Sequence, residues 1–424
     1  MRTLSACLLL ILLLPATTLA VFGDEDHDTS APVIREIVLE GNERTDSALI
    51  LREMGLRIGQ TLSRAEMNDV WIHLEDIGWF AFVDMEFDDS NDDGVILRVY
   101  LEEDMTMAYG PLVRFDRRHK YQLGGWIEET NLRGQGERLR LEVGALYAQH
   151  AALRWSHPWF LGWKGLRLKL GLRGESSNFV YRPTHQKLYR GTAGLRWDLP
   201  RSFFVESSLT FGNTHFDDSY QWAYRGTPGT VRHEAGDYGR LAATLTTGVD
   251  TRDNPWYPSH GILAQADLTR WSGDGFDSYN QGDAEVRVFA PLPIGEHVLA
   301  LRAWGRRVSG PAPLDNYLFF GGPETVRGYQ YAGWEGDEGY LLSVEYRIPL
   351  FIMPISPRGE SVGLGLHAFA DAGDTWFQEN EPQRALQSWG AGAHLVLDTM
   401  QLRFEAAKTR EGDWVFEFMD HFNF

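Results

Sequence analysis

The stretch with the clearest potential for chemistry is Gly321–Tyr329, which reads GGPETVRGY and places one arginine, Arg327, among small turn-forming residues. Two carboxylates follow it, Glu345 in LLSVEYRIP and Asp371 in LHAFADAGD. Both stretches alternate in polarity like β-strands, and each acid falls on the face opposite the apolar residues. Two carboxylates that face one space repel each other, whereas a planar guanidinium can bridge both. The pattern predicts an ion-paired clasp of Arg327, Glu345 and Asp371.

The residues beside Arg327 support this interpretation. Gly321, Gly322 and Gly328 allow the backbone to turn tightly and to approach a neighbouring wall. Val326 and Tyr329 complete the loop motif around the arginine. The alternative is that Arg327 is a solvated loop residue and that the two acids line a water-filled space.

Other candidate sites have weaker patterns. Residues 89–94, DSNDDG, match the first half of a calcium loop, but the twelfth position is Tyr100 where a glutamate is needed. The thirteen histidines show no zinc-binding spacing, and no G-x-S-x-G sequence marks a nucleophile. We therefore expect no metal, no cofactor and no catalytic site.

The first twenty residues predict export. They have a basic start at Arg2, an apolar run from Leu8 to Leu14 and a small residue at the expected cleavage point, Ala20, which is the layout of a signal peptide. The apolar run is too short to cross a bilayer as a helix. Cys7, the one cysteine of the chain, lies inside this leader. We expect an exported mature chain without disulfides.

Composition narrows the class further. A formal net charge of −19 argues against a nucleic-acid partner. The chain has 44 glycines and 13% aromatic residues, and beyond the leader it has no apolar run of helix-spanning length. In an exported protein these features are typical of a transmembrane β-barrel.

An acidic linker at 21–31 precedes a small module that we expect at 32–104. Ser63 and Glu66 have the spacing of a capping box, which predicts the start of its second helix. The alternation of apolar residues predicts the order β-α-α-β-β. The expected elements are strand Val33–Glu40, helix Thr45–Met54, helix Ser63–Ile77, and strands Phe82–Asp88 and Val95–Leu101.

From about Ala108 onward, the pattern changes to long amphipathic strands. Gly165–Arg173, Arg138–Tyr147 and Met400–Ala407 each present one apolar and one polar face. About 315 residues at roughly 20 per strand and turn give on the order of 16 strands. We expect residues 105–424 to form a 16-stranded antiparallel transmembrane β-barrel, because a closed sheet leaves no backbone unpaired in hydrocarbon.

Several of these stretches resemble one known family. VIREIVLEGNERT, IGWFAFVDMEF and GVILRVYLEE look like one POTRA domain. VRGY at Val326–Tyr329 matches the sixth extracellular loop of the BamA/TamA (bacterial surface antigen) superfamily. The resemblance implies that the loop at about 310–339 folds into the lumen, where its arginine meets acids of the wall. Phe422 and Phe424 resemble the terminal aromatic assembly signal of outer-membrane barrels.

The resemblance also implies a non-enzymatic function. It implies insertion, assembly or translocation of proteins at a Gram-negative outer membrane, with a periplasmic POTRA domain that captures clients and a lumen closed by the VRGY loop. The implied partners are outer-membrane lipids, client β-barrel or secreted proteins, and accessory proteins of the periplasm or inner membrane. The alternatives are a secretion pore for a dedicated exported partner, a structural or diffusion barrel, and, more distantly, a membrane hydrolase.

Overall fold

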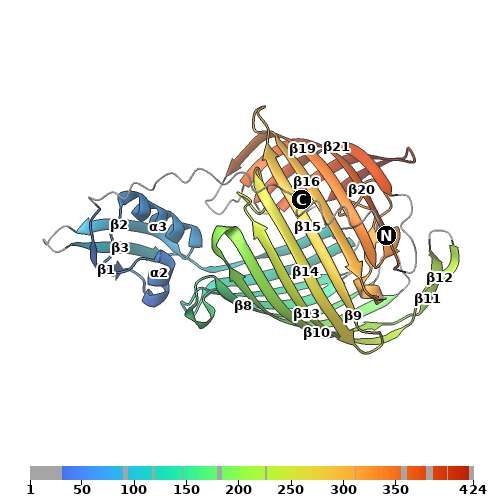
Figure 1. Ribbon diagram of the computed structural model, residues 1–424, viewed down its shortest axis with the longest axis horizontal. Coiled ribbons are helices and arrows are strands. Elements are labelled where there is room, and N and C mark those ends of the chain that lie inside the picture. Colours follow the sequence, from blue (N-terminus) through green and yellow to red (C-terminus); the bar gives the residue numbers. More distant parts are fainter. Residues whose placement is uncertain are drawn as a thin grey trace.

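A small α+β domain lies beside a large β-barrel in the computed structural model (Figure 1). The expected leader, nearly all of the acidic linker, and Phe422 and Phe424 lie outside the described residues, as does most of the calcium-like stretch. The described residues are 31–88, 94–116, 120–146, 148–178, 184–224, 227–310, 312–354, 361–378, 385–398 and 400–419.

The small domain has the predicted order β-α-α-β-β. Its three-stranded sheet has the order β1-β3-β2, with β1 parallel and β2 antiparallel to β3. Two helices accompany the sheet, and the apolar faces of all five elements form one core. The bounds are β1 Ile34–Glu40, α2 Ser47–Met54, α3 Arg64–Ile77, β2 Phe80–Asp88 and β3 Val95–Glu103.

Local chemistry sets the ends of both helices. Asp46 caps α2 by accepting hydrogen bonds from the first turn, and Ser63 and Glu66 form the predicted capping box of α3. Gly55 and Gly78 end the two helices in the left-handed conformation. Among the described residues, no helix is long and apolar enough to span a bilayer.

The barrel is one sheet of 16 strands, as predicted, and each strand is antiparallel to its neighbours in the sequence-ordered ladder. Its strands are β4 Met107–Asp116, β5 Lys120–Leu132, β6 Glu137–Leu146, β7 Ala148–His157, β8 Leu166–Asn178, β9 His185–Asp198, β10 Phe203–Phe216, β13 Gly236–Asp250, β14 Gly261–Gly273, β15 Tyr279–Pro291, β16 Val298–Val308, β19 Glu338–Pro354, β20 Ser361–Trp376, β21 Leu386–Asp398, β22 Met400–Thr409 and β23 Trp414–Met419.

The first and last strands of the barrel form a seam. Among the described residues, β4 and β23 are the two ends of the hydrogen-bonded strand order. The described part of β4 pairs with β5, and that of β23 pairs with β22. Each of these two strands therefore has one edge without a ladder in the described part of the sheet.

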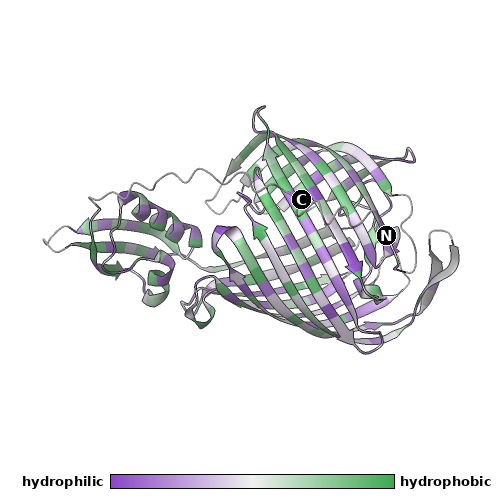
Figure 2. Ribbon diagram, viewed as in Figure 1, coloured by the Kyte–Doolittle hydropathy of each residue, from purple (hydrophilic) through white to green (hydrophobic). Residues whose placement is uncertain are grey.

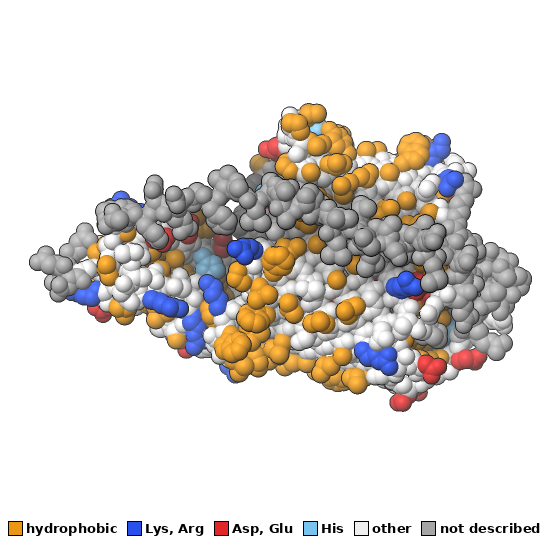
Figure 3. All heavy atoms as spheres, viewed as in Figure 1, with side chains coloured by type: hydrophobic (Ala, Val, Ile, Leu, Met, Phe, Trp, Pro, Cys, Tyr) orange, Lys and Arg blue, Asp and Glu red, His pale blue; other side chains and the backbone are white. Residues whose placement is uncertain are grey.

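Side chains alternate between the two faces of the wall, as hydropathy along the strands shows (Figure 2). On β19, Leu342 is 50% exposed on the outer face, whereas Glu345 is fully buried in the lumen. Hydrophobic side chains are spread over the visible outer face of the barrel (Figure 3). This outer surface is suited to contact lipid.

Connections at the two ends of the barrel differ in length. The end next to the small domain has short turns, whereas a hairpin extends past the opposite end (Figure 1). The connection from β16 to β19 contains a short hairpin of its own. The additional elements are η1 Phe160–Gly162, η2 Pro200–Ser202, β11 Tyr220–Tyr224, β12 Thr227–His233, η3 Leu314–Asn316, β17 Leu318–Phe320 and β18 Trp334–Gly336.

Two short turns of the barrel dock onto the small domain. In the β7–β8 turn, Trp159 is 8% exposed and belongs to the core of the small domain, and its indole N–H donates to Glu53. At the end of β5, beside the β5–β6 turn, the amide of Asn131 donates to the hydroxyl of Thr45 at 2.8 Å. A Cβ on Gly134 would lie 2.0 Å from the carbonyl oxygen of Arg44, so this turn approaches too closely for a side chain.

Two carboxylates of the small domain make this junction sensitive to acid. Burial by itself would raise the pKa of Glu103, but hydrogen bonds from Thr45 and Arg44, together with the charge of Arg44, outweigh burial and lower it. The pKa of Asp46 is lowered first by a hydrogen bond from Gln135 of the β5–β6 turn. Because both pKa values are lowered on folding, the two carboxylates stabilise the junction above about pH 4 and lose this effect as the pH falls further.

We expect the segment of Arg44 and Thr45, which contacts the barrel through Asn131, to loosen in acid before the barrel unfolds. Hydrogen exchange at the backbone amides of Arg44 and Thr45, followed from neutral pH to below about pH 4, should show protection lost as Glu103 is protonated. The variant Glu103→Gln should reduce protection at neutral pH and flatten the acid response. Equal protection at both pH values in the unmodified protein would contradict this explanation.

Candidate functional site

The tip of the β16–β19 loop is buried inside the barrel. Val326, Arg327 and Tyr329 have little or no exposed surface. The loop can turn back on itself because Gly321 has a φ of 98°, and a Cβ at this position would lie 2.1 Å from the carbonyl oxygen of Gln330. The motif singled out in the sequence thus lies against the inner wall.

The structure brings all three clasp residues together. The Arg327 guanidinium donates to both oxygens of Asp371, from Nε at 2.7 Å and from Nη2 at 2.8 Å. Its Nη1 donates to Glu345 at 2.9 Å and to Glu405 at 3.3 Å. The guanidinium also lies 3.6 Å from the ring centroid of Phe369. One arginine thereby binds β19, β20 and β22 at once.

Residues that the sequence analysis did not single out extend the clasp into a larger lumen network. Arg403 donates to Glu345 at 2.6 Å and to Glu405 at 3.0 Å. Arg347 donates to the other oxygen of Glu345 at 3.0 Å. The side chains of the whole network are buried: Arg327, Glu345, Arg347, His367, Asp371, Arg403 and Glu405. The alternation along β22 indicates that Arg403 and Glu405 face the lumen. It does not indicate which side chains they contact, because those contacts depend on the register between strands.

The loop also binds the last strand and the turn before it. The backbone N–H of Gly328 donates to Glu417 of β23 at 3.1 Å. The Tyr329 hydroxyl donates to Glu411 in the β22–β23 turn at 2.6 Å and lies 3.0 Å from the carbonyl oxygen of Gln387. The loop therefore attaches to the strand that borders the seam.

A turn from the opposite end of the barrel reaches the same network. Between β13 and β14, Tyr257 is buried, and its hydroxyl lies 2.9 Å from His394. The carbonyl of Pro258 accepts a hydrogen bond from Arg347 at 3.2 Å. His394 lies 3.1 Å from His367, which contacts Glu405. A series of polar contacts thus connects the tip of the β16–β19 loop to the β13–β14 turn at the opposite end of the barrel.

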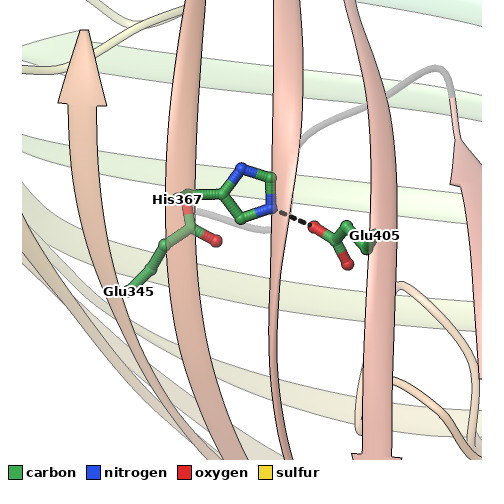
Figure 4. A group of neighbouring side chains, drawn as sticks. All are labelled: Glu345, His367 and Glu405. Atoms are coloured by element: carbon green, nitrogen blue, oxygen red, sulfur yellow. Dashed lines mark hydrogen bonds and ion pairs between the residues drawn. The ribbon is translucent and has the colours of Figure 1, made fainter. Parts of the chain in front are cut away.

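Glu345, His367 and Glu405 lie close enough together to be considered as metal ligands (Figure 4). Their side chains point toward one another from three strands, and the His367 ring is 2.8 Å from Glu405. However, Arg327 and Arg403 each donate to both carboxylates. These guanidinium charges supply the compensation that a metal cation would give. The arrangement is suited to holding strands together, not to metal chemistry.

Gly328 allows the loop to approach β22, which gives a testable steric prediction. Its φ is +84°, and a Cβ would lie 2.8 Å from the Cβ of Ala407. We expect Gly328→Ala to lower the temperature at which the folded barrel band is lost in gels, and Ala407→Gly to restore part of the loss. The control Gly412→Ala, with a φ of +102° and open space around it, has the backbone strain without the clash. Equal effects of the two alanine variants would contradict the close contact.

The fold and the lumen network define the class of this protein: an outer-membrane β-barrel with a POTRA domain. A family model described as "Surface antigen variable number repeat" (POTRA) matches residues 32–104, and the Omp85 superfamily domain matches residues 131–414. The chain belongs to the Omp85 superfamily. It is located in the outer membrane, with the POTRA domain in the periplasm.

Relatives and solved structures agree with this family. The chain is 23% identical over 325 residues to the outer membrane protein assembly factor BamA of Nitratidesulfovibrio vulgaris, covering 70% of this chain and 37% of that relative's length. BamA from Haemophilus ducreyi lacking POTRA domains 1–3 has a TM-score of 0.69 at 17% identity, over 91% of this chain and 83% of that one. CdiB from Acinetobacter baumannii has a TM-score of 0.62 at 15% identity, over 92% and 74%.

Proposed function

We propose that this protein inserts, assembles or translocates other proteins at the outer membrane, without covalent chemistry. Membership of the Omp85 superfamily supports this proposal, as does the similarity to an assembly factor. The chain spans about 37% of the length of that curated relative.

The observation that carries the proposal is the seam between β4 and β23. Each strand has a ladder on one side only within the described part of the sheet. An unpaired strand edge is a template for another strand, and unpaired backbone is costly in hydrocarbon. An incoming client strand would satisfy both edges by backbone hydrogen bonds, which require no particular client sequence.

The clasp of Arg327, Glu345 and Asp371 could act in two ways. It could brace the barrel, or it could hold a plug that moves during transport. Full burial and four charged hydrogen-bonding contacts of the Arg327 guanidinium favour the brace. In this role the loop keeps β19, β20, β22 and β23 together as one wall beside the seam. Opening at the seam would then be a movement of β4 relative to this wall.

The POTRA domain offers a further place for an extended client segment. β2 is an edge strand that pairs with β3 in the three-stranded sheet. The start of β1, the other edge strand, is covered where Ile34 exchanges hydrogen bonds with the backbone of Gly59 and Gln60. We propose β2 as the edge that receives the client. One POTRA domain is a small surface, so a narrow set of clients or accessory proteins fits it best.

Deletion of the gene, followed by quantitation of every outer-membrane and secreted protein, tests this function. The proposal predicts loss of particular barrel proteins or exported clients, restored by the wild-type gene. Loss of a single secreted protein with all barrels unchanged would favour a dedicated secretion pore. If no protein changes and the purified barrel conducts ions steadily, the diffusion barrel replaces the proposal.

A further inference from the structure

A groove of about 1050 Å³ crosses the outer wall of the barrel. Its outer-face residues include Ala370 and Ala372 of β20, which lie between the larger side chains of Leu342 on β19 and Trp389 on β21. The exposure of Leu342, Ala370 and Trp389 and the burial of Asp371 show which face of the wall this is. The surface is concave at this place because the two small alanine side chains lie between larger ones.

The groove lies toward the extracellular end of the barrel. Its lining includes Lys408, Arg410 and Gly412, at the end of β22 and in the β22–β23 turn. This turn contacts Tyr329 of the long loop, whereas the POTRA domain docks at the other end of the barrel. Since the POTRA domain is periplasmic, the groove faces the outer leaflet of the membrane.

The upper end of the groove is basic. The Lys408 ammonium lies 5.7 Å from the ring centroid of Trp389 and 5.6 Å from that of Trp414. The Arg410 side chain is exposed beside it. The acidic neighbour Glu411 does not line the groove, and its carboxylate accepts the hydrogen bond of Tyr329. Two cations therefore lie at the end of an apolar channel.

We propose that this groove binds a phosphate-bearing acyl lipid of the outer leaflet. Lys408 and Arg410 would contact the phosphate, because ammonium and guanidinium groups bind this oxyanion well. An acyl chain would lie in the hollow over Ala370 and Ala372. There it would contact more protein atoms than on a flat wall and would gain more dispersion attraction. The site is independent of the client-handling function proposed above.

Native mass spectrometry of the whole purified protein in detergent tests the site. The probes are dioleoylphosphatidic acid, zwitterionic dioleoylphosphatidylcholine and inorganic phosphate. The protein should bind the first much more tightly than the other two, because only the first combines an unshielded phosphate with acyl chains. Equal binding of the two lipids would overturn the role of the cations, and phosphate binding as tight as lipid binding would overturn the role of the channel.

Two variants address the two halves of the site separately. Replacing both Lys408 and Arg410 with glutamine should weaken phosphatidic acid binding by roughly twenty-fivefold, at about fivefold for each charge. Ala370→Phe should fill the hollow and weaken binding with both cations intact. The control Lys187→Gln removes a cation near the same end of the barrel, where Lys187 lies 3.5 Å from Asp217.

Each variant should first show the heat-stable folded band of the wild type in gels. Folded variants that bind phosphatidic acid as the control does would overturn the proposal. Loss of binding in Lys187→Gln to the same extent would also overturn it, because a general charge effect would then explain the result.

Discussion

Arg327→Glu is expected to detach the long loop from the inner wall and to destabilise the barrel. The substitution replaces a fully buried guanidinium with a fourth carboxylate beside Glu345, Asp371 and Glu405. Breaking one buried ion pair costs about 3–5 kcal/mol, and this change breaks several. Protease cleavage within residues 310–339 and the temperature at which the folded band disappears in gels measure the two effects.

Three further variants make this prediction specific to the clasp. Adding Asp371→Arg to Arg327→Glu should restore part of the stability, since the pair is kept with its charges exchanged. Arg327→Lys should be intermediate, because a point charge cannot hold the carboxylates with a fork of donors. Arg307→Gln, at an exposed arginine of β16 that lies 3.8 Å from Glu338, should change little, because an exposed ion pair contributes little to stability. A single variant Arg327→Glu with an unaltered loop and stability would rule out the clasp.

Trp159→Ala is expected to release the POTRA domain from the barrel. The indole is buried in the core of that domain and donates a hydrogen bond to Glu53, so its truncation removes an apolar contact and a hydrogen bond of the junction. Truncation of a buried tryptophan costs about 3–5 kcal/mol. Spin labels at exposed Ile72 on α3 and Ile294 in the β15–β16 turn should show a narrow distance distribution that broadens in the variant.

Trp163 in the same turn provides the matched control. Its side chain is largely exposed, so Trp163→Ala should leave the distance distribution narrow. A distribution that stays narrow in Trp159→Ala, or that broadens equally in both variants, would contradict the docked arrangement. The variant Trp159→Phe should broaden the distance distribution less than Trp159→Ala does. Phenylalanine fills part of the space but cannot donate a hydrogen bond to Glu53.

Much of the fold follows from patterns that one sequence displays. Period-two alternation indicates which face of each strand meets lipid, and the length of the strand-forming region indicates 16 strands. Ser63 and Glu66 mark the start of α3 because their capping box is a local interaction. These features are readable because they depend on neighbours in the chain or on a repeat.

The larger network was not predicted because it depends on contacts between distant strands. Alternation turns Arg403 and Glu405 inward, but it does not say that they lie beside Glu345, because two strands separate β19 from β22 in the wall. Arg347 lies two residues after Glu345 on the same face and could have been inferred from parity. Register and barrel curvature set such distances, and neither is visible in one sequence.

Aromatic residues near strand ends were harder to interpret. For six aromatic residues near strand ends, the sequence leaves open a membrane girdle or ordinary core packing. Trp163, Trp197 and Trp256 are exposed, Trp155 is partly buried, and the remaining two are Trp159 and Tyr257. The last two are instead buried, one in the POTRA core and the other in the lumen. A tryptophan in a turn has the same local pattern in all three settings, because its partner lies elsewhere in the chain.

Photo-cross-linking at the seam shows whether client proteins enter the barrel between β4 and β23. A photoreactive residue would replace Tyr109 on β4, which is 79% exposed, or Phe416 on β23, and a matched one would replace exposed Leu209 on β10, within the continuous wall. We expect the two seam positions to capture the same outer-membrane or exported proteins that decline on gene deletion, and Leu209 to capture none of them. Equal capture at all three positions, or no capture of those proteins at the seam, would contradict client entry between β4 and β23.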